Sequence, residues 1–351
     1  MPCPKTKRNK QPSCLLRFPY QQNNMSIRRF RRWLCHPIII SMSLLLLIST
    51  IPLYIIYQFE RDDDVLRDYL LNLDDHRTSV EQNHHGEKTA EIIPRIIHQT
   101  YINNQIPEKW LPAYRSCQQV HNDSTWTHVL WTDDTARNLI EESYPWFLPT
   151  YDSYPYAIQR VDAIRYFVIY HFGGFYLDLD IGCRKPLEPF QQFDAIFPKT
   201  QPFGVSNDMM AAFKGHVFFK QLITELKGHS YRVGTKYPTV MWSTGPVFVT
   251  QQLANFLRTK QNQSNVAVPA SSSIEGTVRV IPHELYASAK YSFFTHHPGS
   301  SWHGWDVQVI SFLWQNVFMI AEFAAAITIF TCYQQRRVLK RRTLVVGNGL
   351  C

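Results

Sequence analysis

The sequence predicts an α/β domain with a largely parallel sheet. Three observations support this prediction. Short runs rich in β-branched or alternating apolar residues, at 91–101 and 126–134, read as strands. Apolar residues recur at helical spacing within 156–172. Strands and helices also alternate along the chain from 91 to 183, which is the order of a parallel sheet with helices on its faces.

The individual elements follow from local patterns. A proline before "RIIHQTY" precedes the first strand, and "WTHVLWTDD" alternates before it ends in two acids. Val161, Ile164 and Val168 lie on one stripe of the strongest helix, and the pair Gly173–Gly174 ends it. The predicted elements are strands at 91–101, 126–134 and 175–183, and helices at 109–121, 135–147 and 156–172.

The basic charge of the chain lies at its two ends. The formal net charge is +8, yet residues 58–308 carry 22 basic and 27 acidic residues and are therefore net −5. Nine basic residues and no acid precede residue 58, and five basic residues fall within 336–342. A groove for nucleic acid is not predicted by this distribution.

Two apolar segments explain the basic ends. Residues 38–57 are uncharged, long enough to span about 30 Å of hydrocarbon, and follow "RRFRRWLCH". The positive-inside rule then predicts a signal anchor with a cytosolic tail at 1–37, a stem at 58–91 and a lumenal domain at 92–308. Residues 309–333 are a predicted second span before a cytosolic tail at 334–351. Asn316 and Glu322 leave an amphipathic or buried helix open for this segment.

Two aspartates stand out at the end of the last predicted strand, in "HFGGFYLDLDIGC". Residues two apart in a strand share a face, so Asp178 and Asp180 are expected side by side. Adjacent carboxylates repel unless a cation lies between them, and their oxygens suit Mn²⁺ or Mg²⁺. A solvent-exposed strand end is the alternative. Asp162 and Arg165, three apart on the preceding helix, are either a surface ion pair or a polar pair at a pocket.

Further segments carry a family resemblance. "IPRIIHQTY", "HVLWTDD", "AIQRVDAIRYFVIYHFGGFYLDLDIGCRKPLEPF", "SNDMMAAFKGHVFF" and "WSTGPVFV" resemble the DXD-containing glycosyltransferases of GT-A fold, which include fungal α-mannosyltransferases. "HHPGSSWHGWD", with its apolar segment and basic tail, is similar to the inositol phosphorylceramide mannosyltransferase branch. The resemblance covers about 92–310, and its most specific part is the helix, Gly-Gly and DXD block.

The resemblance implies roles for residues of this chain. Asp178 and Asp180 would bind the metal-bridged diphosphate of GDP-mannose, with His303 as a third ligand for which His296 and His297 compete. Arg165 would assist catalysis and, with Asp162, hold the donor. The other implied donor-binding residues are His98, Gln99, Thr100, Asn207, Asp208, Ser301 and Trp302. Thr244, Gly245 and Pro246 would lie on the acceptor side. Trp305 stands where a second acid is expected, which leaves the role of Asp306 open.

The implied reaction is transfer of mannose from GDP-mannose to inositol phosphorylceramide, with retention, at a Golgi membrane and with a regulatory membrane subunit as a partner. Transfer of mannose or galactose to protein-linked glycans is the alternative, and a non-catalytic scaffold subunit is the second. Cys117 and Cys183 are the only cysteines between the two apolar segments, and one disulfide between them is an open prediction.

Overall fold

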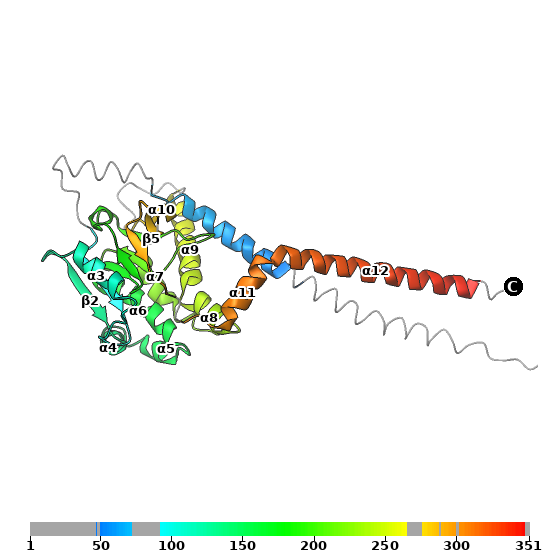
Figure 1. Ribbon diagram of the computed structural model, residues 1–351, viewed down its shortest axis with the longest axis horizontal. Coiled ribbons are helices and arrows are strands. Elements are labelled where there is room, and N and C mark those ends of the chain that lie inside the picture. The colour runs from blue at the N-terminus through cyan, green and yellow to red at the C-terminus, as the bar shows by residue number, and fades with distance from the viewer. Residues whose placement is uncertain are drawn as a thin grey trace, which may run out of the picture. The chain divides into compact units, whose positions relative to one another are not determined.

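The computed structural model describes residue 47 and the ranges 50–71, 92–264, 276–287, 289–299 and 302–347 (Figure 1). Tyr54–Gln315 form one compact unit. A second unit combines Met1–Leu53 with Asn316–Cys351 and includes helix α12 (Val317–Gly347). Everything that bears on the predicted site lies in the first unit.

A six-stranded sheet forms the centre of this unit, in the order β2-β1-β3-β6-β5-β7. Strand β6 runs antiparallel to both of its neighbours, and the other strand pairs are parallel, so the predicted α/β class with a largely parallel sheet is confirmed. The strands are β1 (Ile96–Thr100), β2 (Thr127–Trp131), β3 (Gly174–Leu177), β5 (Ala195–Pro198), β6 (Met209–Ala212) and β7 (Arg279–Ile281).

Helices cover both faces of the sheet. One apolar cluster joins side chains of α6 (Ala157–Phe172), α7 (Val217–Glu225) and α9 (Pro246–Ser264) to one sheet face, and a second cluster includes Cys117 of α3 (Leu111–Val120) on the other. The remaining helices are α4 (Asp133–Ser143), α5 (Leu148–Ser153), a 3₁₀ turn (Glu188–Phe190), α8 (Lys236–Ser243), α10 (His283–Tyr286) and α11 (Trp305–Gln315).

Strand β3 follows α6 through the predicted glycine pair. Gly173 and Gly174 have φ angles of 72° and 97°, a region that L-residues with a Cβ rarely adopt. A Cβ on Gly174 would also lie 2.5 Å from the carbonyl oxygen of Ile96. Along β3, Phe175 and Leu177 pack in one core cluster and Tyr176 packs in the other, as the two-residue period of a strand requires. Strand β3 is an inner strand of the sheet, so Asp178, the residue that follows it, lies in the middle of the sheet.

The predicted strand at 175–183 is wrong in one respect, because it is interrupted. Strand β3 ends at Leu177, and a turn at 178–180 leads to β4 (Ile181–Cys183). Strand β4 pairs antiparallel with β8 (Phe294–His296) in a separate two-stranded sheet. The two aspartates therefore occupy the junction of two sheets and not the end of one continuous strand.

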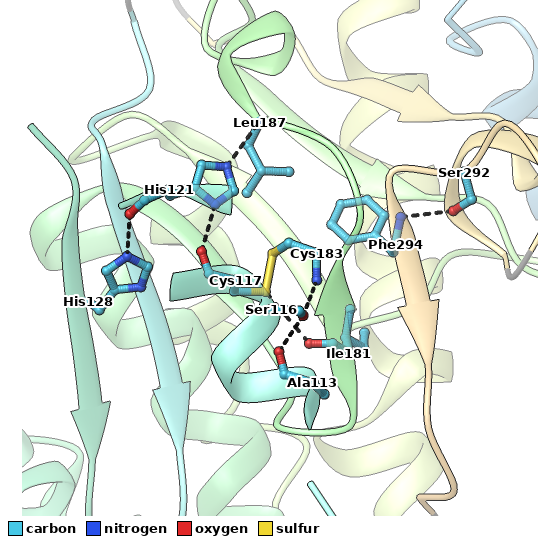
Figure 2. Close-up of a disulfide and its surroundings, with 10 residues drawn as sticks. All are labelled: Ala113, Ser116, Cys117, His121, His128, Ile181, Cys183, Leu187, Ser292 and Phe294. Atoms are coloured by element: carbon cyan, nitrogen blue, oxygen red, sulfur yellow. Dashed lines mark hydrogen bonds between the residues drawn. A yellow bond between two sulfur atoms is a disulfide. The ribbon is translucent and has the colours of Figure 1, made fainter. Parts of the chain in front are cut away.

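A disulfide fixes β4 to α3. Cys117 and Cys183 are bonded, so the predicted pairing is confirmed (Figure 2). Ser116 accepts a hydrogen bond from the backbone N–H of Cys183 at 3.0 Å, and Gly182 leaves no room for a Cβ against Ser116 and Thr295. The chain three residues after Asp180 is therefore held by a covalent bond and by close packing.

The predicted stem joins the compact unit over its described part. A helix spans residues 50–67, and Leu66 is fully buried in the core. Asp63 and Lys199 form an ion pair of 2.7 Å, and Asp62 pairs with Arg258 at 2.6 Å. The compact unit therefore starts well before residue 92.

One described helix is long and apolar enough to cross a bilayer, over Val317–Gln334 of α12. The predicted span at 309–333 is interrupted, because α11 ends at Gln315 and α12 begins at Val317. Most of the predicted anchor at 38–57 lies outside the described residues. The cytosolic and lumenal orientations remain predictions.

Candidate active site

The turn at 178–180 is positioned by strand β6. The backbone N–H of Asp178 donates to the carbonyl of Asp208 at 2.8 Å, which extends the pairing of β3 with β6 by one step. On the other side, the backbone N–H of His297 donates to the carbonyl of Asp180 at 2.8 Å. The segments that carry Asp178, Asp180 and Asp208 are thereby brought together.

Arg165 lies beneath this turn, buried on the inner side of α6. Its guanidinium contacts Asp162 at 3.1 Å and Asp178 at 3.3 Å, and it donates to the carbonyl of Asn207 at 2.7 Å. The face of the guanidinium also lies 4.9 Å from the ring centre of Tyr176. The prediction of a surface ion pair is excluded, since the Asp162 and Arg165 side chains are only 5% and 3% exposed.

Asp162 is the second element of a buried polar network. Its carboxylate accepts hydrogen bonds from Asn207 at 3.1 Å and from the hydroxyl of Thr244 at 2.9 Å. Asn207 also donates to the hydroxyl of Tyr166 at 2.9 Å. Burial raises the pKa of Asp162, and Arg165 opposes that rise. The sequence-predicted residues Asp162, Asn207 and Thr244 therefore form one cluster, and its polar groups hold Arg165 in place.

The electrostatic balance at the turn is negative. Removal from water, with smaller contributions from Asp180 and Asp208, raises the pKa of Asp178 to about 7 against the opposing charge of Arg165. Burial and then Asp208 raise the pKa of Asp180, whereas His296 and Arg165 lower it. The carboxyl of Asp178 remains 29% exposed, so it is accessible to a ligand. Three carboxyl groups repelling one another form a site suited to a cation.

Two tyrosines orient these carboxylates. Tyr176 donates to Asp178 at 2.7 Å and itself contacts the hydroxyl of Thr100 at 2.7 Å. Tyr286 donates to one carboxylate oxygen of Asp208 at 2.5 Å. The other oxygen of Asp208, Oδ1, is buried and has no hydrogen-bond partner among the described residues. Such an oxygen normally has a partner, which supports a bound ligand at this point.

The site fits a divalent ion held by few protein groups. The described part of the chain contains no group of three or more His, Cys, Asp or Glu side chains already arranged for a metal. Asp178 and Asp180 supply hard oxygen ligands, and the unpartnered oxygen of Asp208 lies nearby. Mg²⁺ and Mn²⁺ are often held by one or two carboxylates and complete their coordination with phosphate oxygens.

Both ring nitrogens of His98 bond within the protein, and its predicted contact with the donor remains a prediction. Nε2 lies 2.9 Å from the carbonyl of Gly173, and Nδ1 accepts a hydrogen bond from the indole of Trp131 at 3.1 Å. Burial lowers the pKa of His98 to about 4, so the ring is neutral and Nε2 is the donor. Neighbouring Gln99 is buried with its Nε2 unpartnered among the described residues. Its predicted contact with the donor remains a prediction.

The late motif approaches the turn through Gly299. A Cβ on Gly299 would lie 1.7 Å from Oδ2 of Asp180, so a larger residue here would displace that carboxylate. Ser301, predicted to bind the donor, lies outside the described residues. Gly245 is packed against α8, since a Cβ would lie 3.0 Å from the carbonyl of Val240, and Pro246 begins α9. No described contact tests their predicted acceptor role.

Trp302 and His303 lie around Tyr237. The indole of Trp302 stacks on that ring at 5.4 Å, and His303 meets it edge-on at 5.5 Å. Burial lowers the pKa of His303, and the carboxylate of Asp306 partly opposes that fall. None of the described contacts joins His303 to the aspartates, whereas His296 acts electrostatically on Asp180. The competing His296 and His297 thus lie beside Asp180, and which histidine would bind the metal remains a prediction.

Sequence reasoning missed the roles of Tyr176, Tyr286 and Gly299. Tyr176 was discoverable, because it precedes Asp178 by two residues and so shares its side of the strand. Tyr286 and Gly299 reach the site from far along the chain. No local signal marks their contacts with Asp208 and Asp180.

Similarity to known proteins agrees with this site. Residues 107–201 match the family described as "Glycosyltransferase sugar-binding region containing DXD motif". The chain is 39% identical over 322 residues to inositol phosphoceramide mannosyltransferase 1 of Schizosaccharomyces pombe, covering 90% of this chain and 94% of that protein. It is also 39% identical to mannosyl phosphorylinositol ceramide synthase CSH1 of Saccharomyces cerevisiae, covering 66% of this chain and 58% of that protein.

Among solved structures, the chain resembles one titled "PaToxG Glycosyltransferase", with a TM-score of 0.37 and 17% identity over 60% of this chain and 86% of that one. The relative from Schizosaccharomyces pombe, matched over nearly its whole length, decides the assignment. The chain belongs to the family of DXD-containing glycosyltransferases that includes the fungal inositol phosphoceramide mannosyltransferases.

Proposed function

We propose that this chain is a retaining mannosyltransferase of GT-A type, transferring mannose from GDP-mannose to inositol phosphorylceramide on the lumenal side of a Golgi membrane. The observation that carries the proposal is the match to a named inositol phosphoceramide mannosyltransferase over 94% of its length. The carboxylates that a metal-dependent transfer requires are present and gathered around one turn.

Each side chain has a defined part in this reaction. Asp178 and Asp180 would hold Mn²⁺ or Mg²⁺, which when bound neutralises the charge developing on the departing diphosphate. Arg165 orients Asp178 and contributes fixed positive charge behind the leaving group. Asp162, locked by Asn207 and Thr244, holds Arg165 in place. The network is preorganised because its members are buried.

The family resemblance implies retention at the anomeric carbon, and the carboxylates of the site bear on which retaining route we propose. Hydrolase-type double displacement needs a carboxylate placed as a nucleophile beside the anomeric carbon. The described carboxylates of this site instead surround Arg165 and the metal-binding turn. We therefore propose substitution on the same face as the departing phosphate, which gives an α-mannoside. Formation of a β-mannoside contradicts this step.

Membrane preparations from cells unable to mannosylate inositol phosphorylceramide provide the test. The full chain is supplied with GDP-mannose, Mn²⁺ and the lipid, alongside Asp180→Asn and the matched control Asp152→Asn, whose carboxylate pairs with Arg137 on the surface. Mannosylated lipid is expected from wild type and Asp152→Asn only. Transfer to protein-linked glycans without a lipid product would support the alternative acceptor. No turnover with either acceptor, even with a regulatory membrane subunit co-expressed, would support the scaffold alternative.

A further inference from the structure

Helix α11 presents three distinct sides. At about 100° per residue, Trp305, Val309 and Leu313 form one stripe along it. These three apolar side chains are 70%, 46% and 49% exposed. The exposed polar residues Gln308, Ser311 and Gln315 lie on another side. The third side holds Asp306 and Trp314 and faces the compact unit.

The side that faces the compact unit is anchored firmly. Asp306 is buried and accepts a hydrogen bond from the backbone N–H of Tyr237 at 2.7 Å, in the first turn of α8. That contact holds the pKa of Asp306 below its ordinary value. At the other end of α11, the indole of Trp314 meets the ring of Phe59 edge-on at 6.4 Å. The apolar stripe is therefore fixed in orientation, and this also gives Asp306 a structural role.

Exposed aromatic residues continue beside this contact. The helix over residues 50–67 carries Phe59, whose ring also lies 6.3 Å from the rings of Phe203 and Trp242. Tyr54 and Tyr57 on the same helix are 62% and 58% exposed. Tyrosine and tryptophan are the side chains that accumulate where a protein passes between water and lipid.

We propose that α11 lies in the surface of a lipid bilayer, with Trp305, Val309 and Leu313 inserted among the lipids. Continuity of the chain selects a bilayer as the partner, because Asn316 alone separates α11 from α12, whose residues Val317–Gln334 can cross a membrane. The polar side of α11 carries no charge, so insertion depends on apolar burial and not on anionic lipid. Neutral phosphatidylcholine is a sufficient partner.

This placement connects the membrane to the donor site through one helix. Helix α11 caps the start of α8 through Asp306, and Thr244, directly after α8, donates to Asp162. A bilayer that holds α11 is therefore linked to the site through α8. The inference about α11 goes beyond the proposed function and stands even if the acceptor is a glycan.

Spin labels on the full chain test this placement. Every cysteine outside the disulfide is first replaced by serine. Single labelling sites are then introduced by Val309→Cys or Leu313→Cys, and Gln308→Cys on the polar side is the matched control. The protein is reconstituted in phosphatidylcholine vesicles. Labels at 309 and 313 are expected to collide mainly with oxygen, which concentrates in hydrocarbon, and the label at 308 mainly with a water-soluble nickel chelate. Equal access of nickel to all three positions overturns the proposal, as does shielding from both reagents, which indicates a protein partner.

An activity measurement separates this inference from the proposed acceptor. The double variant Val309→Asp and Leu313→Asp is expected to raise KM for a lipid acceptor in vesicles by about tenfold, equivalent to about 1.4 kcal/mol, because charges near the bilayer surface oppose insertion. Turnover of GDP-mannose with a detergent-dispersed acceptor stays unchanged. Gln308→Asp leaves both values unchanged. An unaltered KM in vesicles for the double variant counts against α11, whereas absence of transfer by the wild type counts against the acceptor alone.

Discussion

Metal affinity is expected to depend on pH through Asp178. Its pKa is raised to about 7, and a metal binds the ionised carboxylate, so protons compete with the ion. A carboxyl with a pKa of 7 is about 9% ionised at pH 6 and about 91% ionised at pH 8. The apparent affinity for Mn²⁺ should therefore rise about tenfold between these values. Binding at pH 7 should release about half a proton per ion through this group.

The assay is titration of the purified full chain with Mn²⁺ in detergent, with free ion measured by electron paramagnetic resonance at pH 6, 7 and 8. Tyr176→Phe removes a hydrogen bond that favours the ionised form of Asp178, so its midpoint should move to higher pH. Asp152→Asn should follow the wild-type curve. Affinity independent of pH, or an unmoved midpoint in Tyr176→Phe, would refute the assignment of the titration to Asp178.

The same pKa makes a prediction for the metal-free protein. The folded pKa lies above the ordinary value of 3.8, so the folded state retains a proton that the unfolded state loses. The resulting stabilisation is complete below pH 4 and is lost as the pH rises through 7. Chemical unfolding followed across this range, with and without Mn²⁺, should show that the ion removes most of the loss. A contribution from Asp178 that grows with rising pH would have the wrong sign.

Three further predictions concern single contacts. Gly299→Ala places a methyl group against Asp180. The value of kcat/KM should therefore fall about 100-fold, with little change in the free energy of unfolding. A fully active variant would show that the loop moves freely. His98→Gln should cost about 1–3 kcal/mol in chemical unfolding and leave KM for GDP-mannose unchanged, because both ring nitrogens bond within the protein; a raised KM would support its predicted donor role. Replacing both Cys117 and Cys183 by serine removes a disulfide between residues 66 apart in the sequence, which should lower the free energy of unfolding by about 4 kcal/mol. Unchanged stability would show that packing alone holds β4.

Much of the fold was predictable because its signals are local. The two-residue period of β1 and β2, the helical stripe of α6 and the glycine pair after it each lie within a few residues. The pairing of Cys117 with Cys183 was predictable as an open choice, since the chain offers no other cysteine between its two apolar segments. The carboxylate pair was predicted from its spacing together with the apolar helix, the Gly-Gly turn and the aromatic strand that precede it.

The errors fall where distant parts of the chain decide the outcome. "FYLDLDIGC" alternates without a break, yet the strand leaves the main sheet at Asp178 because β4 pairs with β8, more than 100 residues later. The bonds from the two ring nitrogens of His98 to Gly173 and Trp131 also depend on distant parts of the chain. Neither partner is adjacent to His98 in sequence, so no local pattern predicts these bonds.

The sequence by itself determined the fold class, the metal-binding residue types and the apolar segments, because composition and periodicity express which groups can be buried and which can bind a cation. Only the tertiary structure decided that Arg165 is buried beneath Asp178, that Asp208 and Gly299 converge on the same turn, and that α11 presents a fixed apolar stripe beside α8. These relations join residues far apart in the chain. Their energies depend on distance and burial, which the order of residues does not specify.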